Sequence, residues 1–159
     1  MNNQHIRSFQ MQQLLESNNQ LKIFVANELK NTENELISSR QVETIAAYLV
    51  RSAGIRANLK GYSYLVKVIT YGVIEPGLLH PISKGAYRVV SEVFGVNVSC
   101  IERRIRSAID SAYTHSPEQL RSIFAYPGDK PYVSEFIAVA VELIRQEMLR
   151  INIEVNDEL

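Results

Sequence analysis

The sequence predicts an all-α protein of several helices, with a helix-turn-helix near its middle and a helical arm at its N-terminus. Apolar residues recur every three or four positions along most of the chain, which is the spacing of amphipathic helices. The period-two alternation of half-buried strands is scarce. At 159 residues, the chain has the length of one ordinary domain with an appended arm.

Three parts are expected: an N-terminal helical arm over residues 1–37, a multi-helix domain over 38–150 and an acidic tail over 151–159. The arm has helical spacing from about His5 to Lys30, with a break at residues 17–19. Its apolar stripe is thin, with Leu21, Phe24 and Leu29 as the clearest members, so we expect it to pack on the body or on a partner chain. It is therefore a candidate dimerisation or docking arm.

The first two helices of the domain are marked by cap and stop signals. Ser38 and Gln41 have the spacing of a capping box, and the helix they open should stop at Gly54. A second helix is expected over residues 58–72, ended by Glu75 and the Pro-Gly pair after it.

The remaining helices follow at short intervals. Ser83 is expected to cap a helix that ends at Gly95 and buries Ala86, Val89, Val90 and Val93. Ser99 should cap the next helix, which runs to about residue 114. A short helix should then open at residues 116–117 and reach Phe124, and Ser134 should cap the last long helix.

Residues 86–109 have the order of a helix-turn-helix: an apolar-faced helix, a glycine, a tight apolar turn and a second helix. Gly95 provides the turn, Val96 fills the angle between the helices, and Ile101 with Ile105 seats the second helix on the first. The side opposite Ile105 is then free. It holds Cys100, Arg103 and Ser107, flanked by Glu102, Arg104, Arg106 and Asp110.

Arginine-rich exposed helices suit nucleic-acid recognition, because the guanidinium fork matches guanine edges and phosphate oxygens. Arg103 and Arg106 are the strongest candidates, and Lys84 and Ser99 near helix N-termini could hold phosphates. The full set of candidate DNA-binding residues is Lys84, Ser99, Glu102, Arg103, Arg104, Arg106 and Ser107. Two simpler readings stay open: a solvated basic face, and a Glu102 that only closes a capping box with Ser99.

The charge pattern gives mixed support. The formal net charge is zero, whereas DNA-binding domains are usually basic. Residues 84–106 nevertheless hold five basic side chains (84, 88, 103, 104, 106) against two acidic ones (92, 102). Residues 131–159 hold two basic side chains (145, 150) against six acidic ones (135, 142, 147, 154, 157, 158). The charges are thus segregated, with a basic middle that could meet phosphates.

From about Gly54 to Met148 the chain resembles the C-terminal DNA-binding effector domain of the master response regulator of sporulation in endospore-forming bacteria. The resemblance is carried by five stretches: GIRANLKGYSYL (54–65), LLHPISKGAY (78–87), SCIERRIRSAI (99–109), SIFAY (122–126) and SEFIA (134–138). It implies a six-helix domain that binds short DNA boxes, often as tandem dimers, and switches transcription by contacting RNA polymerase.

The resemblance also implies roles for single residues. Glu102, Arg103 and Arg106 fall where the family contacts bases or backbone, with Ser99 and Lys84 near phosphates. Cys100 and Ser107 depart from the family, which usually has a basic residue at both positions, so a different box or weaker binding is expected. The surface around Ser122, Ile123 and Phe124 matches a surface with which the family contacts a sigma factor. Phe124 could equally belong to the core. The family's phosphoacceptor receiver domain has no counterpart, so we expect a switch other than aspartate phosphorylation.

Other classes of function fit less well. The three histidines are scattered, without metal-ligand spacing or a nearby nucleophile, so no enzyme activity, catalytic residue, metal or cofactor is expected. No apolar run approaches the roughly 20 residues of a membrane span, no secretory signal is visible, and a single cysteine fits the cytoplasm. The alternative that stays open is a protein-interaction adaptor that keeps the fold with weak or no DNA binding.

Overall fold

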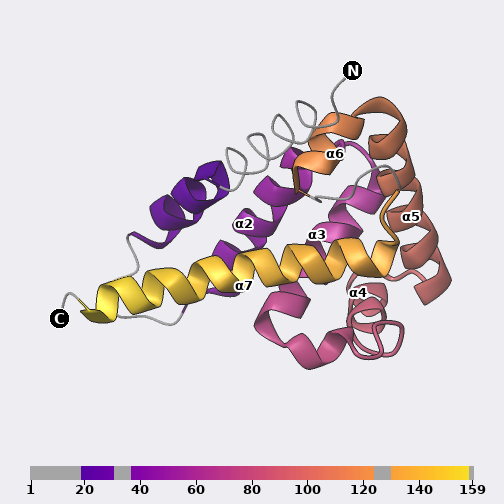
Figure 1. Ribbon diagram of the computed structural model, residues 1–159. Coiled ribbons are helices and arrows are strands. Elements are labelled where there is room, and N and C mark those ends of the chain that lie inside the picture. Colours follow the sequence, from indigo (N-terminus) through magenta and orange to yellow (C-terminus); the bar gives the residue numbers. More distant parts are fainter. Residues whose placement is uncertain (1–18, 31–36, 124–129, 158–159) are drawn as a thin grey trace, which may run out of the picture.

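The computed structural model describes residues 19–30, 37–123 and 130–157, and within these ranges it contains helices and no strand (Figure 1). Residues 19–29 form a first helix. The elements that follow are α2 (Ser39–Ser52), α3 (Lys60–Ile74), the 3₁₀ turn η1 (Pro76–Leu79), α4 (Ala86–Phe94), α5 (Val98–His115), α6 (Pro117–Ile123) and α7 (Val133–Asp157). The predicted all-α class is confirmed.

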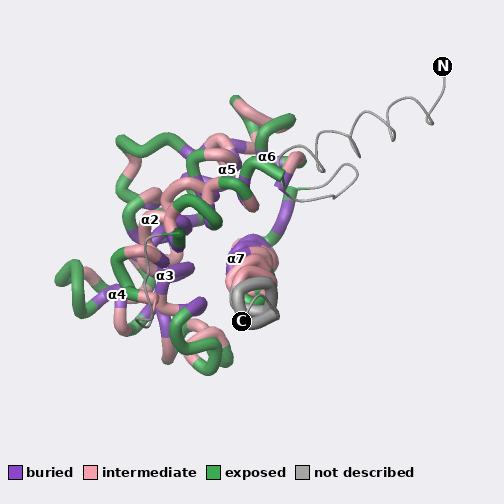
Figure 2. Tube along the Cα trace, turned by 90° about the vertical axis from the view of Figure 1, so that its left-hand side faces the viewer, coloured by how far each residue is buried: buried purple, intermediate pink, exposed green. Residues whose placement is uncertain are grey.

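The core is built around α3, which packs against α2, α4, α5 and α7. Nine of its residues are buried, among them Leu65, Val68 and Ile69. The long α7 crosses the bundle and closes it with Phe136 and Ile144, both fully buried (Figures 1 and 2). Because α3 lies between α2 and α5, the outer faces of those two helices belong to different sides of the molecule.

Residues 19–29 pack on the body of the same chain. Leu21, Val25 and Leu29 are buried in the common core, and the ring of Phe24 stacks on Tyr48 of α2 with centroids 4.1 Å apart. The predicted inward face of this part of the arm is therefore in contact with the domain. Residues 1–18 and 31–36, which together make up most of the expected arm, lie outside the described residues.

The start of α2 is as predicted. Ser38 accepts a hydrogen bond from the backbone N–H of Gln41 at 3.2 Å, and the Gln41 side chain accepts one from the backbone N–H of Ser38 at 2.9 Å. Gly54 ends the helix in a left-handed conformation with φ of 87°. A side chain there would also meet Ser116 at the junction of α5 and α6, since a Cβ would lie 2.7 Å from its Cβ.

The predicted caps of α4 and α7 are wrong. The N-cap of α4 is Gly85, not Ser83, and no side chain caps this helix. The preceding loop requires glycine there, because a Cβ on Gly85 would lie 2.2 Å from the backbone oxygen of Leu78. Ser134 lies inside the first turn of α7, which begins one residue earlier. The same helix continues to Asp157, so residues 151–157 of the expected acidic tail are helical.

The buried face of α4 is rotated from the predicted one. Ala86 and Val90 are buried as expected, but Val93 is 53% exposed and Tyr87 takes its place in the core. Tyr87 is buried instead of Val93 because α3 and α5 pack against the face of α4 that carries Tyr87. No helix in the described ranges combines the length and apolar character needed to cross a bilayer.

Candidate nucleic-acid interface

The turn between α4 and α5 has the predicted form. Gly95 is left-handed, with φ of 67°, and Val96 donates its backbone N–H to the carbonyl of Ser91 at 3.1 Å. A Cβ on Gly95 would meet nothing within 4 Å, so the backbone angle and not crowding requires glycine. Val96 packs half-buried against the core, as predicted. The chain therefore bends sharply after Phe94 and starts α5 in a new direction.

The cap of α5 differs from the prediction. Asn97 is the N-cap, and its Oδ1 accepts a hydrogen bond from the backbone N–H of Cys100 at 2.7 Å. Ser99 lies in the first turn and donates its hydroxyl to the same oxygen at 3.2 Å. The predicted capping box of Ser99 with Glu102 is thus wrong, because a second good capping residue stands two positions earlier. Glu102 is left to face other partners.

The two faces of α5 divide as the spacing predicts. The inner face buries Ile101, Ile105, Ala108, Ile109 and Ala112. The outer face exposes the side chains of Arg103, Arg104, Arg106 and Ser107. The backbone of α5 also touches α3 closely, because a Cβ on Gly61 would lie 2.1 Å from the carbonyl oxygen of Arg104. Gly61 thereby sets how near the helix lies to the body.

The arginines of this face differ in their partners. Arg106 donates to Glu102 at 2.6 Å, and both side chains remain open to solvent, with exposed fractions of 56% and 44%. An exposed pair of this kind contributes little stability, about 0.2–1 kcal/mol, so a stronger anion could replace the carboxylate. The side chains of Arg103 and Arg104 make no hydrogen bond or ion pair with any other described residue. The negative charge of Asp110 is met by Lys130 at 2.5 Å.

Tyr87 of α4 is buried near enough to Glu102 and Arg106 for both charges to act on its phenol. Burial raises the pKa of this phenol to about 12, the negative charge of Glu102 adds to the rise, and Arg106 opposes it. The phenol is therefore neutral at ordinary pH, and its ring supports the base of the exposed face.

The structure brings together part of the predicted site. One open hollow is lined by the turn at 95–97 and by four of the predicted residues, Ser99, Glu102, Arg103 and Arg106. Arg104 and Ser107 extend the same helix face beyond it. Lys84 is exposed on the loop directly before α4 and does not line the hollow.

The predicted sigma-factor surface is separate from α5. Ser122 lies on α6 and donates its hydroxyl to the carbonyl of Gln119 at 2.6 Å. Phe124 lies outside the described residues. Among the described residues, no group of three or more His, Cys, Asp or Glu side chains is placed to hold a metal ion.

A family model described as "Sporulation initiation factor Spo0A C terminal" matches residues 45–144, which is more than half of the chain. The chain belongs to the Spo0A C-terminal family. The resemblance found in the sequence is confirmed. This family is the DNA-binding effector domain of a sporulation regulator and is not an enzyme family. Its match extends from α2 into α7 and contains the whole helix-turn-helix.

Three residues of the site were missed by sequence reasoning. Asn97 carries a signal that could have been used, since asparagine two residues after a turn glycine is a strong N-cap candidate. Gly61 also gives a signal, because a glycine inside a helical pattern often marks a close approach of another backbone. The helical spacing of Tyr87 agrees with its buried place in the core, but its proximity to the charges of Glu102 and Arg106 depends on tertiary packing and has no local signal.

Proposed function

We propose that this member of the Spo0A C-terminal family is a sequence-specific DNA-binding transcription regulator that places α5 in the major groove. The observation that carries the proposal is the outer face of α5. It follows a sharp glycine turn, presents three arginines to solvent, and leaves Arg103 and Arg104 without partners among the described residues. An α-helix fits the width of the major groove, and unpaired guanidinium forks match the acceptors that guanine presents there.

The residues of the face take different roles in this proposal. Arg103 reads a guanine through two parallel hydrogen bonds, and Arg104 binds backbone phosphate. Glu102 accepts a hydrogen bond from a cytosine amine. Arg106 turns from Glu102 to the DNA, and the loss of this exposed ion pair costs little free energy. Ser99 and Lys84 lie near helix N-termini, where phosphates are favoured. Ser107 contributes a hydroxyl contact farther along the helix.

Several parts of the predicted function extend this proposal. We place an N-terminal arm at 1–37, of which residues 19–29 pack on the core, and an effector domain at 38–150, whose last helix continues to Asp157 within the acidic tail (151–159), with action in the cytoplasm. The family resemblance favours a homodimer on paired DNA boxes and a sigma-factor contact through Ser122 and Phe124. Sedimentation of the full chain with and without a two-box duplex would test the dimer.

The experiment for DNA binding starts with selection of binding sites from random duplexes. On the selected duplex, Arg103→Ala should weaken binding by about 1–3 kcal/mol and relax preference at one base pair. Arg103→Lys should keep most of the salt dependence but lose the base preference, because lysine has the charge without the fork. Arg121→Ala on α6 is the matched control and should bind like wild type. Equal binding by wild type and Arg103→Ala would refute the assignment.

The second candidate is a protein-interaction adaptor with little DNA affinity. It is favoured by the zero net charge and by the carboxylate of Glu102, which occupies Arg106 in the absence of DNA. The two functions predict different behaviour on polyanions. A DNA-binding protein is retained on heparin and shifts a duplex in a salt-dependent manner, whereas an adaptor does neither.

A further inference from the structure

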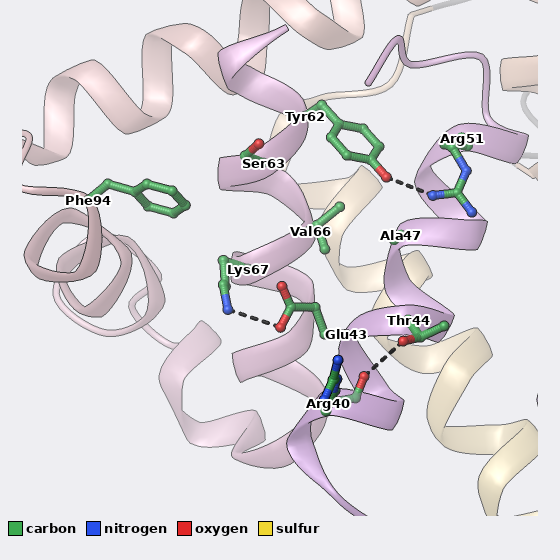
Figure 3. A pocket seen from close by; sticks show the side chains of 10 residues that line it. All are labelled: Arg40, Glu43, Thr44, Ala47, Arg51, Tyr62, Ser63, Val66, Lys67 and Phe94. Atoms are coloured by element: carbon green, nitrogen blue, oxygen red, sulfur yellow. Dashed lines mark hydrogen bonds and ion pairs between the residues drawn. The ribbon is translucent and has the colours of Figure 1, made fainter. Parts of the chain in front are cut away.

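A groove lined by α2, α3 and the last residue of α4 combines basic and apolar residues that the arginine face of α5 does not use. It has a volume of about 490 Å³ and runs between the outer faces of α2 and α3 (Figure 3). On α2 its lining extends from Arg40 to Arg51, a distance of about 16 Å along the helix. That length suits about five residues of extended chain.

The groove has an excess of positive charge. Three cations, Arg40, Arg51 and Lys67, face one carboxylate, that of Glu43. Glu43 is held by Lys67 at 3.0 Å, which leaves the two arginines as the excess charge. The whole chain has a formal net charge of zero, so this excess is local.

Arg51 is positioned for an incoming anion. Its Nη1 donates to the phenol oxygen of Tyr62 at 3.0 Å, and Figure 3 shows the two side chains meeting from α2 and α3. A guanidinium has five N–H donors, and the hydroxyl oxygen of Tyr62 accepts from only one of its nitrogens. The remaining donors can bind a carboxylate in the strong paired geometry of charged hydrogen bonds.

The floor and one side of the groove are apolar. Ala47 and Val66 form the floor, and Phe94 flanks the groove while remaining 38% exposed. The ring of Phe94 is held edge-on against Tyr64, with centroids 4.9 Å apart, so it is fixed in place. A site for phosphate alone would gain nothing from these apolar surfaces, whereas a peptide with acidic residues and one apolar side chain would use both.

We propose that the α2–α3 groove binds an acidic peptide segment of a partner protein, with its carboxylates on Arg51 and Arg40 and an apolar side chain between Ala47, Val66 and Phe94. The groove and the hollow on α5 have no lining residue in common, but Phe94 of the groove directly precedes Gly95 of the hollow, so the groove signals are also to be followed with a DNA duplex. The proposal does not depend on DNA binding. It gives the protein a second surface through which a partner could be brought to its binding site.

The test uses the full chain and a fluorescein-labelled peptide of about eight residues, made of Glu and Asp with one central Phe. Binding is followed by fluorescence anisotropy and by ¹⁵N–¹H spectra. We expect the signals of Ala47, Ser63 and Val66 to shift, and expect the same peptide with Gln and Asn in place of the acids not to bind. Arg51→Glu should lower the affinity by about tenfold or more, and Ala47→Glu, which places a carboxylate on the floor, should do the same.

Arg121→Glu, on α6 outside the groove, is the matched control for charge and should change the affinity by less than about twofold. Circular dichroism checks that each variant folds. No binding at about 1 mM acidic peptide, or equal binding by the neutral peptide, would overturn the proposal. It would also be overturned if a DNA duplex, and not the peptide, shifted the groove signals, since the cations would then extend the DNA-binding surface.

Discussion

Gly61→Ala tests whether the distance between α3 and α5 is fixed by the absence of one side chain. A Cβ at this position would lie 2.1 Å from the carbonyl oxygen of Arg104 and 2.9 Å from the Cβ of Ala108. Ordinary contacts begin near 3.4 Å, so α5 would have to move by about 1.3 Å. The opposing atoms are backbone and a methyl group, which cannot rotate away. Overpacking of this kind costs up to about 3 kcal/mol, and the better helix propensity of alanine returns at most about 1 kcal/mol.

We therefore expect a net loss of about 2 kcal/mol in the free energy of unfolding, measured by urea titration followed by circular dichroism. The melting temperature should fall by roughly 4–8 °C. Because the shift displaces the arginine face, affinity for the selected duplex should fall as well. Gly72→Ala is the control on the same helix, since its Cβ would meet only side-chain ends, those of Leu79 and Val141 at 2.9 Å. Wild-type stability and DNA affinity in Gly61→Ala would show that the missing side chain does not set the distance between α3 and α5.

Three further predictions concern the turn and the support of α5. Asn97→Ala should lower the free energy of unfolding by about 1 kcal/mol in urea titration, because it removes the side-chain oxygen that accepts from the backbone N–H of Cys100. Ser99→Ala should lower it by under about 0.5 kcal/mol. A larger loss for Ser99→Ala than for Asn97→Ala would show that Ser99 is the N-cap. Gly95→Ala should lower the free energy of unfolding by roughly 1–2 kcal/mol, because alanine resists the left-handed backbone at this position. Gly95→Asn should lower it less, because asparagine adopts that conformation more readily. Equal losses would contradict a purely conformational cause. Burial raises the pKa of Tyr87 from 10.0 to about 12, so its stabilising contribution is complete below pH 10 and is lost as pH rises to 12. Between neutral pH and pH 11, the free energy of unfolding of wild type should fall by about 1.4 kcal/mol more than that of Tyr87→Phe, measured by urea titration. A difference between the two proteins that does not change with pH would contradict a buried phenol.

The helices and the helix-turn-helix could be predicted because their signals are local. The capping box of Ser38 with Gln41 depends on residues three apart, and the left-handed stop at Gly95 depends on one residue's freedom at φ. The exposed arginines followed from the same logic, since burial of Ile101 and Ile105 fixes the opposite face of α5. These features need no knowledge of the rest of the fold.

The errors arose where several residues could do the same task or where distant elements decide. Asn97 and Ser99 are both good caps, and only the turn geometry selects the first. Val93 has the spacing of a core residue, but α3 and α5 meet the other side of α4, where Tyr87 lies. The close contact of Gly61 joins segments more than 40 positions apart, so a glycine inside a helical pattern could indicate a close approach but could not identify Arg104 as the partner.

The proposed DNA recognition depends on direct contact between the guanidinium groups of α5 and the duplex. The most direct measurement is a titration of ¹⁵N-labelled protein with the selected duplex, following the side-chain Nε–H signals of its arginines. We predict that the signals of Arg103, Arg104 and Arg106 shift in proportion to bound duplex, while that of Arg121 stays in place. Shifts at other surfaces with these three signals unmoved would contradict the proposed interface.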